Sequence, residues 1–386
     1  MQMRTDDVSR APVRGAALTR ALAWLGPDFG LVALFTAGLV GLIAAYGGRF
    51  RWQEGPILIS TAIGAGLIAA RFAWRAPSIV RGAPGARAAF AQSARNIAVD
   101  WGPLILIMWL FQNLEPYTGV IRETSIDPVL YDLDVAIFGV EPSVWLSRYA
   151  TPLVTDYMSL AYGLYFITPM VLATALSVRG RREEFQLMST AVVLQLGIGF
   201  VLFLCFPAGP PRYYEPLLHG GFDPPQLQSL SGLLELQQGA FDRADPLRMR
   251  SAFPSLHCSL ALITLYFSRR SSDAVFPRAP RLWGRIATVL VVSLWISVIY
   301  LRHHWAVDIA AGLALGALSL ALAPVLRRRW PRRAAPRVAD PAGALAGGEP
   351  ASVAAPAGVL ALMMAGRAAE PTAAEPGEPR DAWARR

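Results

Sequence analysis

The chain has 386 residues, of which 54% are hydrophobic and only 16% are charged, and its mean hydropathy is +0.38. This composition excludes an ordinary soluble domain and predicts an all-α, polytopic integral membrane helical bundle, because several apolar runs approach the roughly 20 residues that a helix needs to cross a bilayer. The formal net charge is +9 and every basic residue is Arg. Most of these arginines flank the apolar runs, so the charge indicates membrane orientation and not nucleic-acid binding.

Eight apolar runs are expected to cross the membrane as helices. They cover residues 29–46, 56–70, 97–111, 153–177, 185–206, 254–267, 286–301 and 305–326. The first run begins late and lacks a small-residue cleavage site, which predicts a retained span and not a removed signal peptide. The Ala/Pro/Arg-rich tail after the last run carries no sustained apolar pattern, which predicts disorder.

Two long polar intervals, 112–152 and 207–252, interrupt the runs. The first is acidic, and within it Leu130, Leu133 and Ile137 are spaced for one face of a helix that lies at the membrane interface. Arginine clusters occur in the N-terminal segment and after the second, fourth, sixth and eighth runs. If eight spans alternate, all five clusters fall on one side, which the positive-inside rule assigns to the cytoplasm.

This orientation places both long intervals outside the cytoplasm and divides the chain into four expected regions. They are a cytoplasmic N-terminal segment at 1–28, N-terminal membrane helices with an exterior interfacial loop at 29–177, a membrane core with three polar motifs at 178–330, and a disordered cytoplasmic tail at 331–386. We expect the protein in the plasma (inner) membrane, with the motifs facing the exterior or periplasm.

Three of the four histidines fall in two of these polar motifs, at 248–257 and 300–308. In the second motif, His304 and Asp308 are four residues apart at the start of a helix, so the carboxylate can reach the imidazole and stabilise its cationic form. A charge pair at a helix entrance is the simpler alternative for this spacing.

The first histidine motif reads Phe-Pro-Ser-Leu-His and runs into the sixth apolar run. Pro254 suits an early helical position, which puts His257 in the first turn of that helix. The free N–H groups of a helix N-terminus attract anions, and Ser255 adds a hydroxyl donor. An ordinary loop-to-helix boundary explains the same residues without a ligand.

The third motif is the Pro/Gly-rich segment at 206–214, which presents Arg212 at the membrane surface beside Tyr213. Arginine suits bidentate contacts with phosphate, although a snorkelling Arg in an aromatic belt is equally compatible with this segment. Together the three motifs bring imidazoles, a carboxylate, guanidinium groups and a helix N-terminus to one membrane depth. Phosphoryl transfer through a phosphohistidine needs such a set.

Over roughly 206–312, the three motifs resemble those of the type 2 phosphatidic acid phosphatase superfamily. The sequence Phe-Pro-Ser-Leu-His and the double His before an aromatic residue most resemble those of its inositol phosphorylceramide synthase (inositolphosphotransferase) branch. The resemblance implies that His304 is the nucleophile, that Asp308 orients it and that His257 protonates the leaving alkoxide. From their own chemistry, Arg212 and Ser255 are expected to help hold the substrate phosphate.

The sequence departs from the superfamily pattern at three positions. They are Cys205 in place of a Lys, Val298 in place of an Arg, and Tyr213 in place of a Pro. Arg302 lies four residues after Val298, so we expect it on the same helical face, where it can take over the phosphate contact. His303 and Tyr213 are expected to contact the residues that bind the substrate and not the substrate itself.

These observations predict a lipid phosphotransferase that moves a phospho-headgroup from a lipid phosphate or phospholipid donor to a lipid alcohol, without metal or another cofactor. A lipid phosphate phosphatase of the phosphatidic acid or isoprenyl phosphate type, with water as acceptor, is the alternative. A non-catalytic lipid-binding membrane protein is the third interpretation.

The two cysteines, Cys205 and Cys258, lie at the ends of predicted helices. Their interpretation as small buried apolar residues is simpler than a disulfide between them.

Overall fold

The computed structural model describes residues 25–48, 85–218, 227–235 and 250–331, together with a few isolated positions near the N-terminal end. The predicted span at 56–70 lies almost wholly outside the described residues. So do most of the predicted N-terminal segment and nearly all of the predicted disordered tail.

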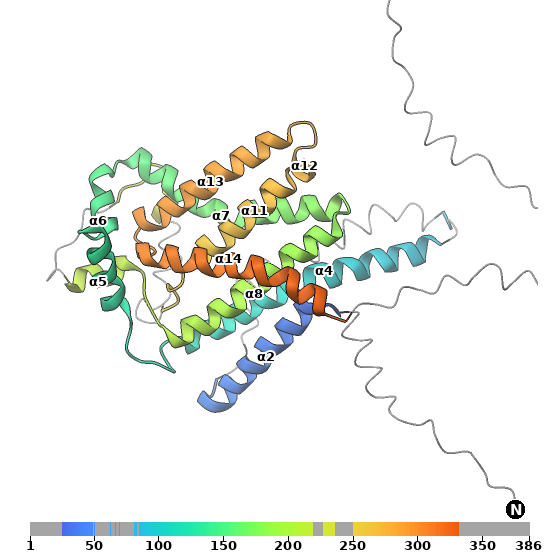
Figure 1. Ribbon diagram of the computed structural model, residues 1–386, viewed down its shortest axis with the longest axis horizontal. Helices are drawn as coiled ribbons and strands as arrows, with labels where there is room; N and C mark the ends of the chain where they lie inside the picture. The colour runs from blue at the N-terminus through green and yellow to red at the C-terminus, as the bar shows by residue number, and fades with distance from the viewer. Residues whose placement is uncertain are drawn as a thin grey trace, which may run out of the picture. The chain divides into compact units, whose positions relative to one another are not determined.

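The described ranges are helical, and the β-structure recorded in them is an isolated bridge between Ala208 and Ser251. Figure 1 shows the helices, which are α2 (Pro27–Tyr46), α4 (Ala86–Leu114), α5 (Asp127–Phe138), α6 (Pro142–Leu146), α7 (Pro152–Val178), α8 (Arg182–Cys205), α9 (Pro211–Leu218), α11 (Leu256–Arg270), α12 (Ser272–Val275), α13 (Pro280–Tyr300) and α14 (Ala306–Arg329). The predicted all-α membrane bundle is therefore confirmed.

In the described part of the chain, six helices are long and apolar enough to cross a membrane: α2, α4, α7, α8, α13 and α14. The predicted sixth span corresponds to α11, which has 15 residues and is thus about 22 Å long, less than the roughly 30 Å of a hydrocarbon core. The expected count of eight spans is therefore not established. Helices α4 and α13 also begin earlier than predicted, because their first turns are polar and a hydropathy run detects only the apolar part.

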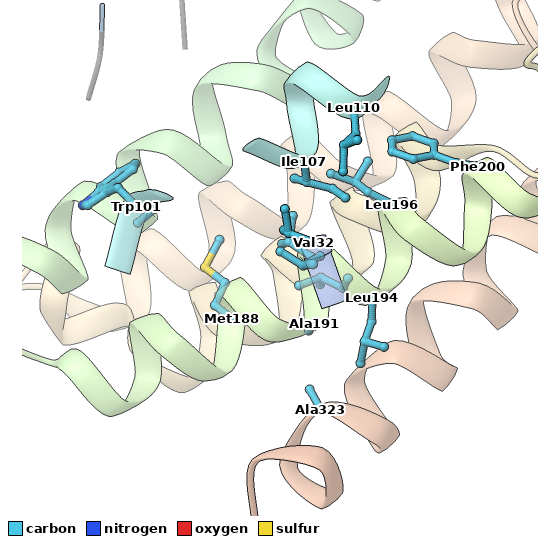
Figure 2. Close-up of a cluster of buried hydrophobic side chains, with 14 of the residues drawn as sticks. Val32, Trp101, Ile107, Leu110, Met188, Ala191, Leu194, Leu196, Phe200 and Ala323 are labelled. Carbon is cyan, nitrogen blue, oxygen red and sulfur yellow. The ribbon is translucent and has the colours of Figure 1, made fainter. Parts of the chain in front are cut away.

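Helix α8 is at the centre of the packing and contacts α2, α4, α7, α11 and α14. Its side chains join a large apolar core that contains Ala191, Leu194 and Phe200 together with Val32 of α2 and Ala323 of α14 (Figure 2). Where α8 approaches α11, a Cβ added to Gly199 would lie 2.3 Å from Leu256. The atom concerned is Cδ2 of the Leu256 side chain, so a larger residue at position 199 would require that side chain to move.

Helices α11 and α14 approach each other closely through two glycines of α14. A Cβ at Gly312 would lie 2.3 Å from the backbone oxygen of Ser255, and one at Gly316 would lie 2.9 Å from that of Ser259. Because no side chain intervenes, the N-termini of the two helices come together. This contact sets the distance between the two histidine motifs.

The helix predicted at Leu130, Leu133 and Ile137 is present as α5, and its position at the membrane interface stays a prediction. These leucine and isoleucine side chains do not share one buried face. Leu130 is buried against Trp305, whereas Leu133 and Ile137 are exposed. The inward face instead carries Asp127, Leu130 and Asp134, because the two carboxylates bind main-chain groups of the neighbouring motifs. Figure 1 shows α5 at the same end of the bundle as the turn between α13 and α14.

Both cysteines are free thiols. Cys205 is exposed and Cys258 is buried.

Candidate active site

The second histidine motif forms the turn between α13 and α14. Nδ1 of His304 lies 3.2 Å from Oδ2 of Asp308, which also accepts a hydrogen bond of 3.1 Å from the backbone N–H of Trp305. His304 is 3% exposed and Asp308 is fully buried. The contact predicted from the four-residue spacing is therefore present, and it belongs to a closed site and not to a solvated helix entrance.

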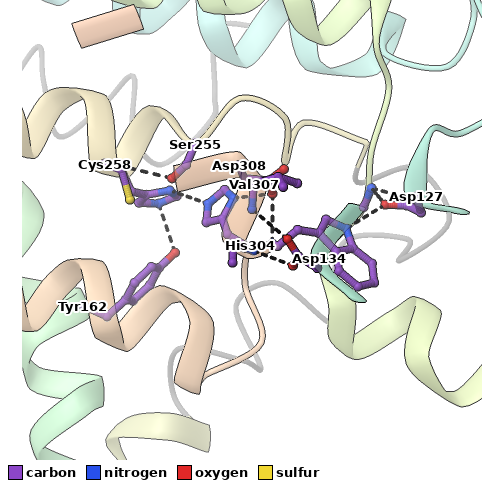
Figure 3. A network of polar contacts seen from close by, with 12 residues as sticks. Asp127, Asp134, Tyr162, Ser255, Cys258, His304, Val307 and Asp308 are labelled. Atoms are coloured by element: carbon purple, nitrogen blue, oxygen red, sulfur yellow. Dashed lines mark hydrogen bonds and ion pairs between the residues drawn. The ribbon is translucent and has the colours of Figure 1, made fainter. Parts of the chain in front are cut away.

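The first histidine motif reaches the same point from α11. Nδ1 of His257 lies 3.0 Å from Nε2 of His304, and Nε2 of His257 lies 3.1 Å from the hydroxyl of Tyr162 on α7. Figure 3 shows the resulting line of polar contacts from Tyr162 to Asp308. Because the carboxylate of Asp308 can only accept, His304 donates from Nδ1, and its Nε2 carries a lone pair toward His257.

Burial decides the charge of the second histidine motif. Burial lowers the pKa of His304 to about 4, and a hydrogen bond with the backbone of Ala252 opposes this shift only in part. Burial, followed by the positive charge of Arg212, holds the pKa of His303 well below its usual range. Both imidazoles are therefore neutral near pH 7, and Nε2 of His304 is available as a nucleophile.

Arg302 does not occupy the helical face that its spacing from Val298 predicted. Helix α13 ends at Tyr300, and Arg302 adopts a left-handed backbone conformation with φ of 58°. The backbone carbonyl of Val298 accepts hydrogen bonds from the N–H groups of His303 (2.9 Å) and His304 (3.1 Å). The chain thus turns back sharply after α13, and Arg302, which is 7% exposed, lies in this turn and not on a helix face.

The motif of Arg212 is joined to this turn by its main chain. The backbone N–H of Arg212 donates to the carbonyl oxygen of Arg302 at 3.3 Å. The guanidinium donates to the hydroxyl of Tyr213 at 2.6 Å, and its carbon lies 4.6 Å from the centre of that ring. His303 stacks on Tyr162 with ring centres 4.5 Å apart. The segment of Arg212 is therefore joined through the main chain to the turn that carries Arg302, His303 and His304, and the charge of Arg212 acts on His303.

Ser255 has a different local role from the one expected. It is the N-cap of α11, where its hydroxyl oxygen accepts a hydrogen bond of 3.3 Å from the N–H of Cys258. Pro254 therefore precedes the cap and does not occupy an early helical position. The backbone N–H of Ser255 donates to the carbonyl oxygen of Asp308 at 3.1 Å, so Ser255 ties the two histidine motifs together.

Two buried carboxylates of α5 were missed as site residues. Asp127 accepts hydrogen bonds from the backbone N–H of Gly209 (3.0 Å) and from the indole of Trp305 (3.2 Å). Asp134 accepts hydrogen bonds from the first two N–H groups of α14, those of Ala306 (2.7 Å) and Val307 (2.9 Å). Burial raises the pKa of both carboxyl groups, and these hydrogen bonds oppose the shift. Their seven-residue spacing, which puts both on one helical face, was the signal available in the sequence.

An open apolar groove of about 720 Å³ runs along α7, where Phe166, Met170 and Val178 line it. None of the motif residues lines this groove. The polar geometry of the three motifs, not the size of a cavity, therefore identifies the candidate site.

Two known proteins are similar to part of the chain. The chain is 28% identical over 196 residues to an inositol phosphorylceramide synthase of Candida albicans, a match that covers 48% of this chain and 40% of that protein. It is 22% identical over 206 residues to a phosphoinositol dihydroceramide synthase of Bacteroides thetaiotaomicron, covering 49% of this chain and 64% of that protein. The chain thus matches less than two thirds of the length of either relative. No solved structure matches the chain significantly.

The family model of the PAP2 superfamily matches residues 130–322. This region begins within α5 and ends within α14, so it includes all three motifs, both histidine-bearing turns and Asp134. The family assignment and the geometry of the site therefore rest on the same part of the chain, and the protein belongs to the PAP2 superfamily.

Proposed function

We propose that this membrane protein is a lipid phosphotransferase that acts through a phosphohistidine and moves a phospho-headgroup to a lipid alcohol, as its inositol phosphorylceramide synthase-like relatives suggest. The observation that carries the proposal is the line of contacts from His257 through His304 to Asp308. A neutral imidazole nitrogen is oriented by a carboxylate on one side and faces a second imidazole on the other. Covalent catalysis with a general acid requires this arrangement.

The first half-reaction forms the phosphoenzyme. A donor phosphoryl group takes the place between the two facing nitrogens, and Nε2 of His304 attacks phosphorus while the bond to the leaving alkoxide oxygen breaks. That oxygen takes a proton from His257. Asp308 stabilises the positive charge that develops on His304. Arg212 and Arg302 bind the phosphoryl oxygens, because guanidinium groups match their geometry and charge.

The second half-reaction uses the same groups in reverse. His257 takes the proton of the acceptor hydroxyl, whose oxygen attacks phosphorus as the bond to His304 breaks. A lipid alcohol as acceptor makes the enzyme a transferase, and water makes it a lipid phosphate phosphatase. Burial of the histidines favours the transferase, because it restricts the access of water to the phosphohistidine.

The proposal includes an orientation in which the motifs lie outside the cytoplasm, in the plasma or inner membrane. It keeps the four regions expected from the sequence, with 178–330 as the catalytic core. The arginine distribution along the chain supports both statements.

Purified protein in lipid vesicles tests the proposed reaction. Vesicles containing phosphatidylinositol as donor and ceramide as acceptor are incubated with the protein, and the products are measured by mass spectrometry. Transfer of phosphoinositol to ceramide, absent with His304→Ala, is the expected result. Release of free phosphate from phosphatidic acid, with no transfer in any donor and acceptor pair, would instead identify a phosphatase. The absence of both reactions would contradict phosphoryl transfer at this site.

A further inference from the structure

We infer that Tyr162 is a positioning residue for His257, holding its imidazole so that Nδ1 exchanges protons with the reacting oxygens. The inference rests on the proposed function and adds to it a residue outside the three motifs. Tyr162 lies on α7, 95 positions before His257 in the chain, and is 4% exposed.

Helix α7 fixes the imidazole of His257 with one hydroxyl and two rings. The hydroxyl of Tyr162 lies 3.1 Å from Nε2 of His257, and the two ring centres are 5.2 Å apart. The ring edge of Tyr165 packs on the same imidazole at 4.4 Å. The other contact of the Tyr162 ring is the stack on His303. Rotation of His257 out of line with His304 would break several of these contacts.

The direction of each hydrogen bond follows from Asp308, whose carboxylate accepts from Nδ1 of His304. Nε2 of His304 is then an acceptor, so Nδ1 of His257 donates to it. This leaves Nε2 of His257 as an acceptor, and its hydrogen-bond partner within the described ranges is Tyr162. The hydroxyl thus selects the tautomer of His257 whose proton points at His304, where the phosphoryl group reacts.

A tyrosine hydroxyl can serve both charge states of His257. It donates to Nε2 when the imidazole is neutral with its proton on Nδ1, and it accepts from Nε2–H when the imidazole is cationic. In the reaction, the Nδ1 proton of the imidazolium passes to the leaving oxygen as the P–O bond breaks. Nδ1 later takes the proton of the acceptor hydroxyl as the P–N bond to His304 breaks. Tyr162 keeps its own proton in both steps.

The test compares Tyr162→Phe with Tyr157→Phe. Tyr157 lies on the same helix, and its hydroxyl bonds to Ser293 of α13 at 2.5 Å, so each variant loses one interhelical hydrogen bond. Each protein is assayed with phosphatidylinositol, whose leaving group is an alkoxide, and with 4-nitrophenyl phosphate, whose leaving group needs no proton. Because acid–base catalysis contributes about 100-fold or more, we expect Tyr162→Phe to lower kcat about 10- to 100-fold on the lipid, to change KM little, and to change phosphoenzyme formation from the aryl ester little.

Equal behaviour of the two variants, or an equal loss on both substrates, would overturn the role of Tyr162 while leaving the proposed function intact. A wild-type protein without phosphoryl-transfer activity on either substrate would overturn both. If Tyr162→Phe does not fold, 3-fluorotyrosine placed at position 162 keeps the ring and the hydroxyl. This more acidic hydroxyl donates better and accepts less well, so it favours the neutral imidazole. The limb of the pH–rate profile that His257 controls should then move to lower pH, and an unchanged limb would overturn the inference.

Discussion

Nδ1 of His257 and Nε2 of His304 face each other at 3.0 Å, and the opposite nitrogen of each ring is held by a different kind of group. His304 is held by the carboxylate of Asp308, which stabilises a cation, and His257 by the neutral hydroxyl of Tyr162. This asymmetry assigns two different tasks to two similar side chains. The imidazole of His304, which is bonded to a carboxylate, is suited to form a covalent intermediate. The imidazole of His257 is suited to proton exchange.

Replacement of each histidine should separate these tasks. His304→Ala should abolish both turnover and any trapped phosphoenzyme, because the nucleophile is gone. His257→Ala should slow turnover of lipid donors but still allow labelling with an aryl phosphate. Asp308→Asn should keep the fold and lower the rate, because the imidazole loses its carboxylate. Acid-labile phosphoenzyme in His304→Ala but not in His257→Ala would show that the roles are reversed.

Replacement of Arg302 should weaken binding of the transition state. Arg302→Lys keeps the charge but loses the planar pair of donors. We expect transition-state binding, calculated from kcat/KM, to weaken by about 2–3 kcal/mol, as for removal of one oriented donor. Arg212→Lys should behave in the same way. Asn tolerates the left-handed backbone of residue 302, so Arg302→Asn removes the charge with little added backbone strain. Activity within about twofold of wild type in both Arg302 variants would exclude this residue from phosphate binding.

Substitution at Gly312 should separate the two histidine motifs. A methyl group there would lie 2.3 Å from the backbone oxygen of Ser255, so Gly312→Ala must push α11 away from α14. We expect a destabilisation of about 1–3 kcal/mol, typical of overpacking, together with a large loss of kcat. Gly38→Ala in α2 is the matched control, because in the described part of the chain no atom of another element lies within 4 Å of its added Cβ. Thermal unfolding in detergent and turnover measure the two effects, and full activity in Gly312→Ala would contradict this account of the helix contact.

Acid should destabilise the protein through its buried imidazoles. The pKa of His304 is about 4 in the folded protein and near 6.5 in an unfolded chain, so the unfolded state binds more protons between these values. The contribution of His304 to stability therefore rises with pH across this window, and a change from pH 7 to pH 5 should remove on the order of 2 kcal/mol of that contribution, whereas the raised pKa values of Asp127 and Asp134 act in the opposite direction. Thermal unfolding at a series of pH values measures the slope. The slope should be smaller in His304→Gln, and an equal slope in that variant would assign it to other groups.

Reporter fusions should locate the motifs relative to the membrane. A reporter fused after Arg329 should behave as cytoplasmic, and one inserted near Gln228 as exterior, because the arginine clusters mark the cytoplasmic side. The two sites lie on opposite sides of the bilayer in the expected topology. If both reporters report the same side, the alternation of eight spans is wrong, and the exterior position of the site fails with it.

The local parts of this site could be predicted from the sequence, and the parts that depend on tertiary packing could not. The four-residue spacing predicted the His304–Asp308 contact, although His304 precedes the N-cap of α14 and the contact crosses the start of that helix. Tyr162 gave no such signal, because the approach of α7 to α11 depends on packing between helices far apart in the chain. Arg302 was misplaced because left-handed residues are usually Gly or Asn, so nothing in the sequence marked the end of α13 two residues before it. The seven-residue spacing of Asp127 and Asp134 indicated a shared helical face, but only the fold shows that this face binds Gly209, Trp305 and the start of α14.

The motifs are joined to one another by main-chain hydrogen bonds, from Arg212 to Arg302 and from Ser255 to Asp308. None of these bonds uses a reactive side chain. A variant that lacks the nucleophile His304 should therefore keep the backbone arrangement of the site, with Arg212 and Arg302 still present. A His304→Gln variant would then retain its donor lipid instead of consuming it. Native mass spectrometry of that inactive protein, purified from its own membrane, would identify the headgroup and the acyl chains directly, before any substrate had been guessed.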